Sequence, residues 1–248
     1  DVYPTKNKRT GGYSGGSYDT DPYILLNYQD KYNDMSTLIH EMGHSMHSYY
    51  SRSYNEFQNS EYRIFVAEVA STVNELLLSH YMLENSGSKE EKLFILNNLM
   101  ELYKATIYRQ TMFAEFERDT SKIIDNDGAL TSEKLSNMYY DLNKFYFGDN
   151  VYVDDEIRYE WERIPHFYYN FYVYKYATGL SAATKIVDNI LNKKENAVSN
   201  YIEFLKCGSK LSPLESLKVA GVDLADDEVV TLALKTFGNY VDMYKKEM

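Results

Sequence analysis

The stretch HEMGHSMH, from His40 to His47, constrains the fold more than any other part of the sequence. His40 and His44 are four residues apart, so a helix brings both imidazoles to one face, about one turn from each other. Glu41 lies between them, and H-E-x-x-H is the pattern of a zinc site in which two histidines bind the metal and the glutamate activates water. The pattern therefore predicts a helix that carries part of a metal site.

Two histidines do not complete such a site, because a catalytic zinc has three protein ligands and an open fourth position. The metzincin pattern is absent, since His47 and Tyr50 stand where it requires Gly and His. We expect the third ligand to be Glu68, because a lone acid in the apolar helical run FVAEVASTVNE is costly unless it is paired or bound to a metal. If residues 51–60 form a loop between antiparallel helices, rises of about 9 Å and about 10 Å return Glu68 to the level of the second histidine.

Other titratable residues near this stretch have both a structural and a functional interpretation. His47 is about 10 Å along the helix from His40, too far to share a metal, so a structural role is favoured over a supporting one. Glu75 suits a partner to a ligand histidine as well as it suits a surface acid. His80, alone on an apolar helix, is expected to be structural. For the whole motif, a chance H-E-x-x-H on a solvated helix is the alternative, and the well-placed Glu68 argues against it.

The chain is predicted to be mainly α-helical with a short β element near its N-terminus. Gly11–Tyr18 and Tyr23–Tyr28 are expected to form a hairpin or neighbouring strands. Asp34 or Ser36 is expected to cap the first helix, and Gly87 to end the second. The helices are expected over residues 35–50, 61–84, 88–125, 131–147, 180–194, 197–207, 213–220 and 226–248, with a further segment over 154–179 that is broken at Pro165. No repeat or linker is found, so residues 1–248 are expected to form a single catalytic domain.

Charge and cysteine content exclude several kinds of partner. A net charge of −11 argues against nucleic acid and anionic membranes, which need a basic face. No apolar run approaches the ~18 residues of a membrane span. A single cysteine, Cys207, excludes an internal disulfide and fits a reducing, cytoplasmic compartment. The chain begins with Asp1, and we expect it to be a fragment of a longer polypeptide.

Three motifs, taken in order, carry a resemblance to a known family. HEMGHSMH, FVAEVASTVNE and IPHFYYNFYVYKYATG resemble the M3 family of zinc oligopeptidases, most closely its oligoendopeptidase F branch. The opening DVYPTKNKRTGGYSGG resembles the segment before the zinc helix of that branch, so the resemblance covers nearly the whole chain. It implies a zincin-like helical catalytic domain in which His40, His44 and Glu68 bind zinc and Glu41 is the general base.

The resemblance also implies that a histidine and tyrosines after Pro165 face the substrate and stabilise the oxyanion. The histidine would be His166. Among the tyrosines, Tyr172 and Tyr176 are four residues apart and would share a helical face, so they are the first choice. Tyr169 is the third choice, as a substrate-binding residue, and aromatic core packing accounts for some of the other rings.

The implied activity is cleavage of short peptides in a deep channel walled by helices. Members of the branch are longer than this chain, so a missing N-terminal part of the parent chain is expected to form much of the opposite wall. We therefore consider two main hypotheses: the chain is a zinc-dependent endopeptidase, or it is a zinc- and peptide-binding fragment without independent activity. A metallo-aminopeptidase or carboxypeptidase is a third. The run PYILLNY suits both an added strand for a peptide backbone and simple sheet core.

Overall fold

The computed structural model describes residues 1–248 and shows two compact units. The first is formed by Asp1–Glu101 together with Thr178–Met248, and the second by Leu102–Ala177. The chain is mainly helical, as predicted, and no helix combines the length and apolar character that crossing a membrane requires. That the two units act as one catalytic domain stays a prediction.

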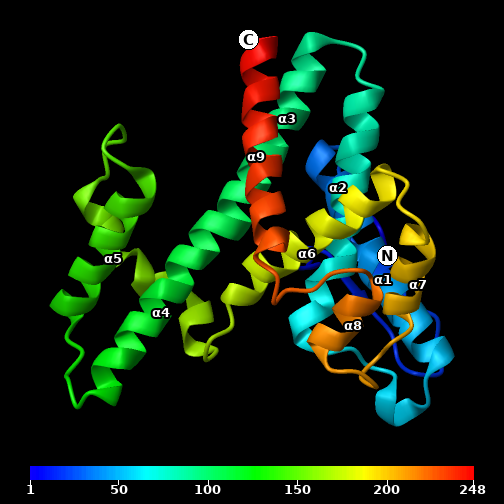
Figure 1. Cartoon of the computed structure of the whole chain (residues 1–248), viewed down its shortest axis with the longest axis horizontal. Helices are drawn as coiled ribbons and strands as arrows, with labels where there is room; N and C mark the ends of the chain where they lie inside the picture. The colour runs from blue at the N-terminus through cyan, green and yellow to red at the C-terminus, as the bar shows by residue number, and fades with distance from the viewer. The chain divides into compact units, whose positions relative to one another are not determined.

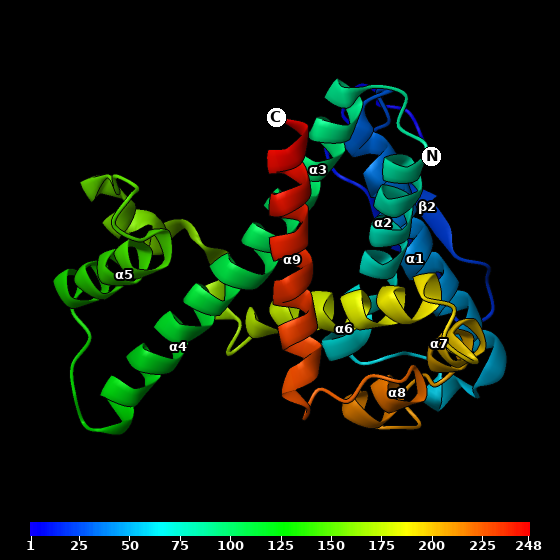
Figure 2. The same ribbon diagram turned by 45° about the horizontal axis from the view of Figure 1, so that its top comes forward.

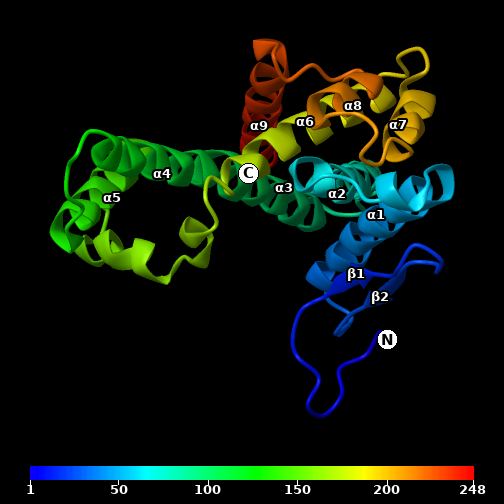
Figure 3. The same ribbon diagram turned by 90° about the horizontal axis from the view of Figure 1, so that it is seen from below.

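The first unit opens with the predicted hairpin. The strands β1 (Tyr13–Gly15) and β2 (Tyr23–Leu25) pair antiparallel, and both are shorter than expected. The hairpin lies against α1 (Tyr32–Tyr54), as Figure 3 shows. The hydroxyls of Ser14 and Ser45 are 2.9 Å apart and join the two elements. The hairpin is thereby fixed on the helix that carries the histidine motif.

The helices of the first unit surround an apolar core. Val69, Ala70, Val73 and Leu76 are all buried, and their spacing turns one face of α2 inward. Figures 1 and 2 show α2 beside α1 and the later helices α7 and α8 in the same unit. The elements are α2 (Ala67–Glu84), α7 (Ala197–Leu205), α8 (Pro213–Val219) and α9 (Asp227–Glu247), with the 3-10 turns Phe57–Asn59 and Ile64–Val66, and most of α3 (Lys89–Tyr103) and α6 (Tyr174–Leu191).

The helices α1 and α2 run antiparallel, and their backbones lie close together at Gly43. A Cβ placed on Gly43 would lie 2.5 Å from Cα of Ser71 and 2.6 Å from the carbonyl oxygen of Ala70. Farther along, the side-chain amide of Asn74 donates to the carbonyl of Ile39 at 3.3 Å. Only glycine leaves room for this backbone contact, which sets the separation of the two helices beside the histidine motif.

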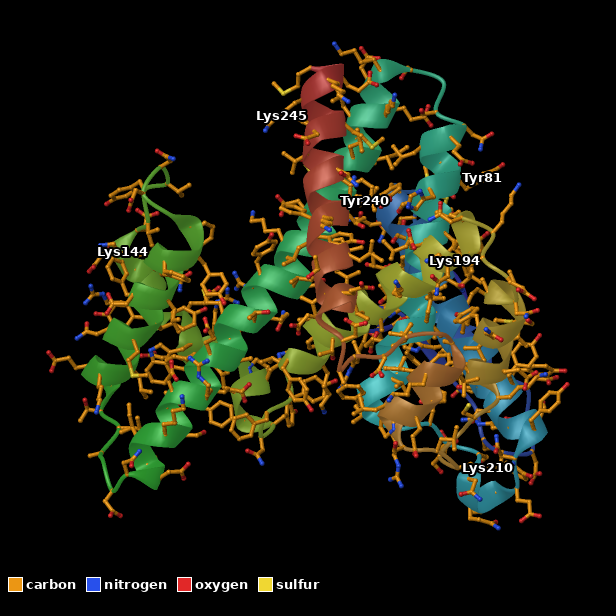
Figure 4. All side chains as sticks on the ribbon, viewed as in Figure 1. Tyr81, Lys144, Lys194, Lys210, Tyr240 and Lys245 are labelled. Atoms are coloured by element: carbon orange, nitrogen blue, oxygen red, sulfur yellow. The ribbon has the colours of Figure 1, made fainter.

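His80 and Tyr240 connect α2 to α9. Nε2 of His80 and the hydroxyl of Tyr240 are 3.1 Å apart and share a hydrogen bond. Figure 4 labels Tyr240. Burial raises the pKa of Tyr240 to about 12, so the hydroxyl keeps its proton at neutral pH. His80 therefore has a packing role, in agreement with its predicted structural interpretation.

The second unit packs α4 (Arg109–Asp125) against α5 (Ser132–Phe147). Thr131 caps α5 at the predicted start of this helix, and its side chain accepts a hydrogen bond from the Lys134 amide at 3.2 Å. The core of this unit consists of Met112, Phe113, Phe116, Tyr139, Ile164 and Val173. A π-helical turn (Lys104–Tyr108) precedes α4, and the 3-10 helices η4 (Asp155–Arg163) and η5 (Pro165–Tyr168) follow α5.

Some predicted helix ends are wrong. Lys31, not Asp34 or Ser36, is the N-cap of α1; Asp34 lies inside the first turn and accepts hydrogen bonds from the backbone amides just before the helix. The second helix ends at Glu84, and its C-cap is Asn85, whose amide bonds back into the last turn, rather than Gly87. Within 154–179, the regular α-helix begins only at residue 174.

Candidate active site

His40, His44 and Glu68 lie together between α1 and α2. The Nε2 atoms of the two histidines are 3.2 Å apart. Oε2 of Glu68 lies 3.4 Å from Nε2 of His40 and 3.6 Å from Nε2 of His44. All three side chains are partly exposed, so one ligand atom from each points to a common place that solvent can reach.

These spacings fit a tetrahedral metal ion. Bonds of about 2.0–2.2 Å at tetrahedral angles separate nitrogen and oxygen ligands by roughly 3.3–3.6 Å. The observed separations of 3.2, 3.4 and 3.6 Å agree closely with that range. Two imidazoles and one carboxylate are also the donor set of one class of catalytic zinc site, which keeps a fourth position open.

The chain brings Glu68 to the histidines by a different path from the predicted one. The first helix continues to Tyr54, and Glu68 is the second residue of α2 rather than about the seventh. The connecting segment runs back along α1, since the Ser51 hydroxyl donates to the Ser60 carbonyl at 2.6 Å. Glu68 therefore lies near the histidines, as predicted. The predicted loop and helix lengths that led to this expectation are wrong.

Glu75 contacts His40 on the side away from Glu68. Its Oε2 lies 3.5 Å from Nδ1 of His40, and its Oε1 accepts a hydrogen bond from Ser36 at 3.3 Å. Burial lowers the pKa of His40, but hydrogen bonds to Glu68 and Glu75 outweigh it and raise this pKa to about 10. Burial opposes ionisation of Glu68 as well, yet the two histidines hold its pKa far below the usual range. Of the two interpretations of Glu75, the structure favours the partner to a ligand histidine.

Glu41 lies beside these three residues without joining them. It is 7% exposed, and its carboxylate is not among the clustered ligand atoms. Residues 41 and 44 are three apart on one helix, so they lie on neighbouring parts of its surface. The role of general base stays a prediction.

His47 is buried away from the cluster. Its ring stacks on Tyr62 with centroids 3.6 Å apart and an interplanar angle of 4°, and it lies 5.2 Å from the ring of Phe204. Its Nδ1 is buried without a hydrogen-bond partner. Burial, with a smaller effect from His44, lowers the pKa of His47 to about 3. These contacts support the structural interpretation of this histidine.

We expect His47 to make the folded chain less stable as the pH falls below about 6.5. The fold keeps this ring neutral, whereas the unfolded chain takes up a proton near the ordinary pKa of 6.5. The contribution of the neutral His47 ring to the free energy of unfolding is therefore fully present above pH 6.5. It decreases by up to about 1.4 kcal/mol per pH unit down to about pH 3.

Urea unfolding of the metal-free chain at pH 7.5 and 5.0 measures this effect. The wild type should lose about 2 kcal/mol more than His47→Phe between the two pH values, because the variant keeps a ring against Tyr62 but cannot titrate. Equal losses in the two proteins would show that His47 is not the group responsible.

The second unit gathers four of the predicted site residues into one group, called here the aromatic cluster: His166, Tyr169, Tyr172 and Tyr176. The ring of His166 has its centroid 5.7 Å from Tyr172, 6.1 Å from Tyr176 and 6.3 Å from Tyr169. The rings of Tyr172 and Tyr176 are 5.7 Å apart. They do not share a helical face as predicted, because α6 begins at Tyr174. Their roles in catalysis and substrate binding stay predictions.

Gly43 lies beside the cluster of His40, His44 and Glu68, and it was not identified from the sequence. It lies between the two histidines, and glycine in a helix interior costs about 1 kcal/mol relative to alanine. That cost, in the middle of an H-E-x-x-H helix, was the available signal that the position has a packing requirement.

Known proteins share both the sequence and the fold. Residues 1–236 match the profile of Peptidase family M3. Oligopeptidase PepF of Bacillus subtilis (strain 168) is 51% identical over 242 residues, covering 98% of this chain and 36% of that protein. The oligoendopeptidase F homolog of Lactococcus lactis subsp. lactis (strain IL1403) is 43% identical, covering 99% of this chain and 41% of that protein.

A solved structure agrees with these matches. The crystal structure of oligoendopeptidase-F from Enterococcus faecium superposes with a TM-score of 0.78 at 40% identity, covering 87% of this chain and 39% of that one. The chain thus spans about two fifths of the length of the relatives it matches. The predicted resemblance to the oligoendopeptidase F branch is confirmed, and the chain belongs to Peptidase family M3.

Proposed function

We propose that this chain carries the metal site of a zinc-dependent endopeptidase that hydrolyses short peptides. The observation that carries the proposal is the cluster of His40, His44 and Glu68, whose ligand atoms are spaced as a tetrahedral zinc requires. The relatives support peptides as the substrate, since they are named oligopeptidase and oligoendopeptidase.

In this proposal each residue of the site has a defined task. Zinc bound at the cluster would lower the pKa of a bound water toward about 7 and polarise the scissile carbonyl. Glu41 accepts the proton of the attacking water and returns it to the leaving amine. Glu75 holds the ring of His40 through Nδ1, which fixes the nitrogen that faces the metal.

The aromatic cluster supplies hydrogen-bond donors for the substrate. His166 and the hydroxyls of Tyr172 and Tyr176 donate to the oxyanion that develops on the scissile carbonyl, and Tyr169 contacts the bound peptide. Loss of one oxyanion donor typically lowers the rate by about 10²–10³. Tyr169, at 61% exposure, is open to a ligand.

The competing proposal is a zinc- and peptide-binding fragment that does not cleave. It is favoured by one observation, namely that the chain spans only about two fifths of its relatives. An exopeptidase is the third possibility, and it differs in requiring a free peptide terminus. Three expectations stay predictions: a partner role for an N-terminal part of a longer parent chain, the exclusion of nucleic acid and membrane partners, and a cytoplasmic location.

Metal analysis combined with a doubly blocked, internally quenched peptide separates these proposals. We expect one zinc per 248-residue chain and internal cleavage, read by mass spectrometry. Glu68→Gln should lose the zinc, whereas Glu84→Gln, an exposed acid at the other end of α2, should keep it. One zinc without cleavage would favour the binding fragment, and cleavage only of unblocked peptides would favour an exopeptidase. A wild-type chain that binds no zinc would refute the site.

A further inference from the structure

Glu117, on α4 of the second unit, is a buried acid that the proposed mechanism does not use. It is 8% exposed, and its helix neighbours Phe113 and Phe116 belong to the apolar core. Oε1 accepts a hydrogen bond from the backbone N–H of Phe171 at 3.1 Å, while Oε2 is buried without a partner. Burial raises the pKa of Glu117 against the opposing effect of this bond. Burying such a group is costly, and the bond to Phe171 is what offsets the cost.

Phe171 has an unusual backbone conformation. Its φ is +51°, in the left-handed region that a bulky side chain rarely adopts. Its side chain is 43% exposed, so core packing of this ring does not hold the conformation. Residues of this kind persist where the surroundings impose them, and they gather at functional sites. The contact that the structure provides at this backbone is the carboxyl of Glu117.

The left-handed turn lies inside the aromatic cluster. Phe171 separates Tyr169 from Tyr172 in the chain, and the rings of these two tyrosines lie 6.3 Å and 5.7 Å from the ring of His166. Apolar packing fixes the segment on either side, since Phe167 packs on the core rings and Val173 is 1% exposed. Between Phe167 and Val173, Glu117 provides a polar contact by accepting the hydrogen bond from the N–H of Phe171.

We propose that Glu117 is a positioning residue that holds the segment His166–Tyr176 in the conformation that assembles the aromatic cluster for the substrate. Its effect on catalysis rests on the proposed peptidase function. Its effect on the conformation of the segment does not, and hydrogen exchange measures that effect separately from hydrolysis.

Three single variants test the proposal. Glu117→Leu removes the acceptor at similar volume, and Glu117→Gln keeps a carbonyl oxygen in the same place. Glu115→Leu is the matched control on the same helix, because Glu115 accepts from the hydroxyl of Tyr146 at 2.8 Å and not from this segment.

We expect amide exchange of residues 166–176 to be about tenfold faster in Glu117→Leu, and unchanged in Glu117→Gln and Glu115→Leu. In the same preparations, kcat for the quenched peptide should fall by about tenfold to a hundredfold for Glu117→Leu only, since small misplacements of catalytic groups cost that much. Zinc content should stay at the wild-type value, because Glu117 is not among the clustered ligands.

A second comparison probes the turn directly. Glycine adopts a positive φ without steric cost, so adding Phe171→Gly to Glu117→Leu should restore most of the slow exchange. The proposal is overturned if Glu117→Leu leaves the exchange unchanged, if Glu115→Leu raises it equally, or if kcat is unaffected in an active enzyme. If Glu117→Leu does not fold, a tenfold faster exchange in Glu117→Gln overturns it instead. A wild-type chain that cleaves nothing refutes the proposed function, and the exchange rates still decide the role of Glu117.

Discussion

Replacing Glu41 by glutamine should lower kcat/KM for a short peptide about a thousandfold, within the range of about 10²–10⁴ that general base catalysis contributes. The amide keeps the shape of the side chain but cannot accept the proton of the attacking water. Zinc content should not change, because the Glu41 carboxylate is not among the clustered ligand atoms. The quenched peptide assay and metal analysis on the same preparation measure both quantities.

The control for this variant is Glu84→Gln, which removes an exposed carboxylate elsewhere in the first unit and should leave both values unchanged. A fall of less than tenfold in Glu41→Gln, at full zinc content, would show that another group is the base. Loss of zinc in this variant would instead assign Glu41 to the ligand set.

Gly43→Ala should destabilise the first unit by about 2 kcal/mol or more. The added Cβ would lie 2.5 Å from Cα of Ser71, and a backbone atom cannot swing aside as a flexible side chain does. Overpacking of this kind costs about 1–3 kcal/mol and occasionally more, and it outweighs the gain of up to about 1 kcal/mol in helix propensity. The helices must separate, so Glu68 moves away from the histidines and zinc affinity should fall at least tenfold.

Gly238→Ala is the matched control for this substitution. Gly238 lies in α9, and a Cβ there would have no atom within 4 Å, so this variant should become more stable by up to about 1 kcal/mol. Urea unfolding with a chelator gives the stability, and a zinc titration gives the affinity. If both alanine variants are stabilised alike, the contact at Gly43 does not set the helix separation.

Local signals predicted the elements that local interactions determine. Thr131 and the capping box of Ser212 with Glu215 begin helices where the sequence indicated, because a cap depends only on residues three apart. The proximity of His40, His44 and Glu68 was predicted for a similar reason. The helical spacing of His40 and His44 is local, and a lone acid in an apolar run needs a partner.

The features that the sequence did not predict depend on contacts between residues that are distant in sequence. No local rule gives Phe171 a positive φ, since its hydrogen-bond partner is 54 residues away. The prediction that Tyr172 lies on a helical face was wrong, because the residue stands between this turn and the start of α6 at Tyr174. Glu117 did not carry the signal that identified Glu68, because Glu115, Arg118 and Asp119 flank it and the run around it is not apolar. The boundaries of the two units were missed because no change of composition marks them.

The close approach at Gly43 also bears on protein engineering. The geometry of the three ligands follows from one backbone-to-backbone contact between two antiparallel helices, together with four positions on those helices. The cluster is therefore a portable unit: a designed helical hairpin that crosses at a glycine, with two histidines on one helix and a glutamate in the first turn of the other, carries the same donor set without the rest of this fold.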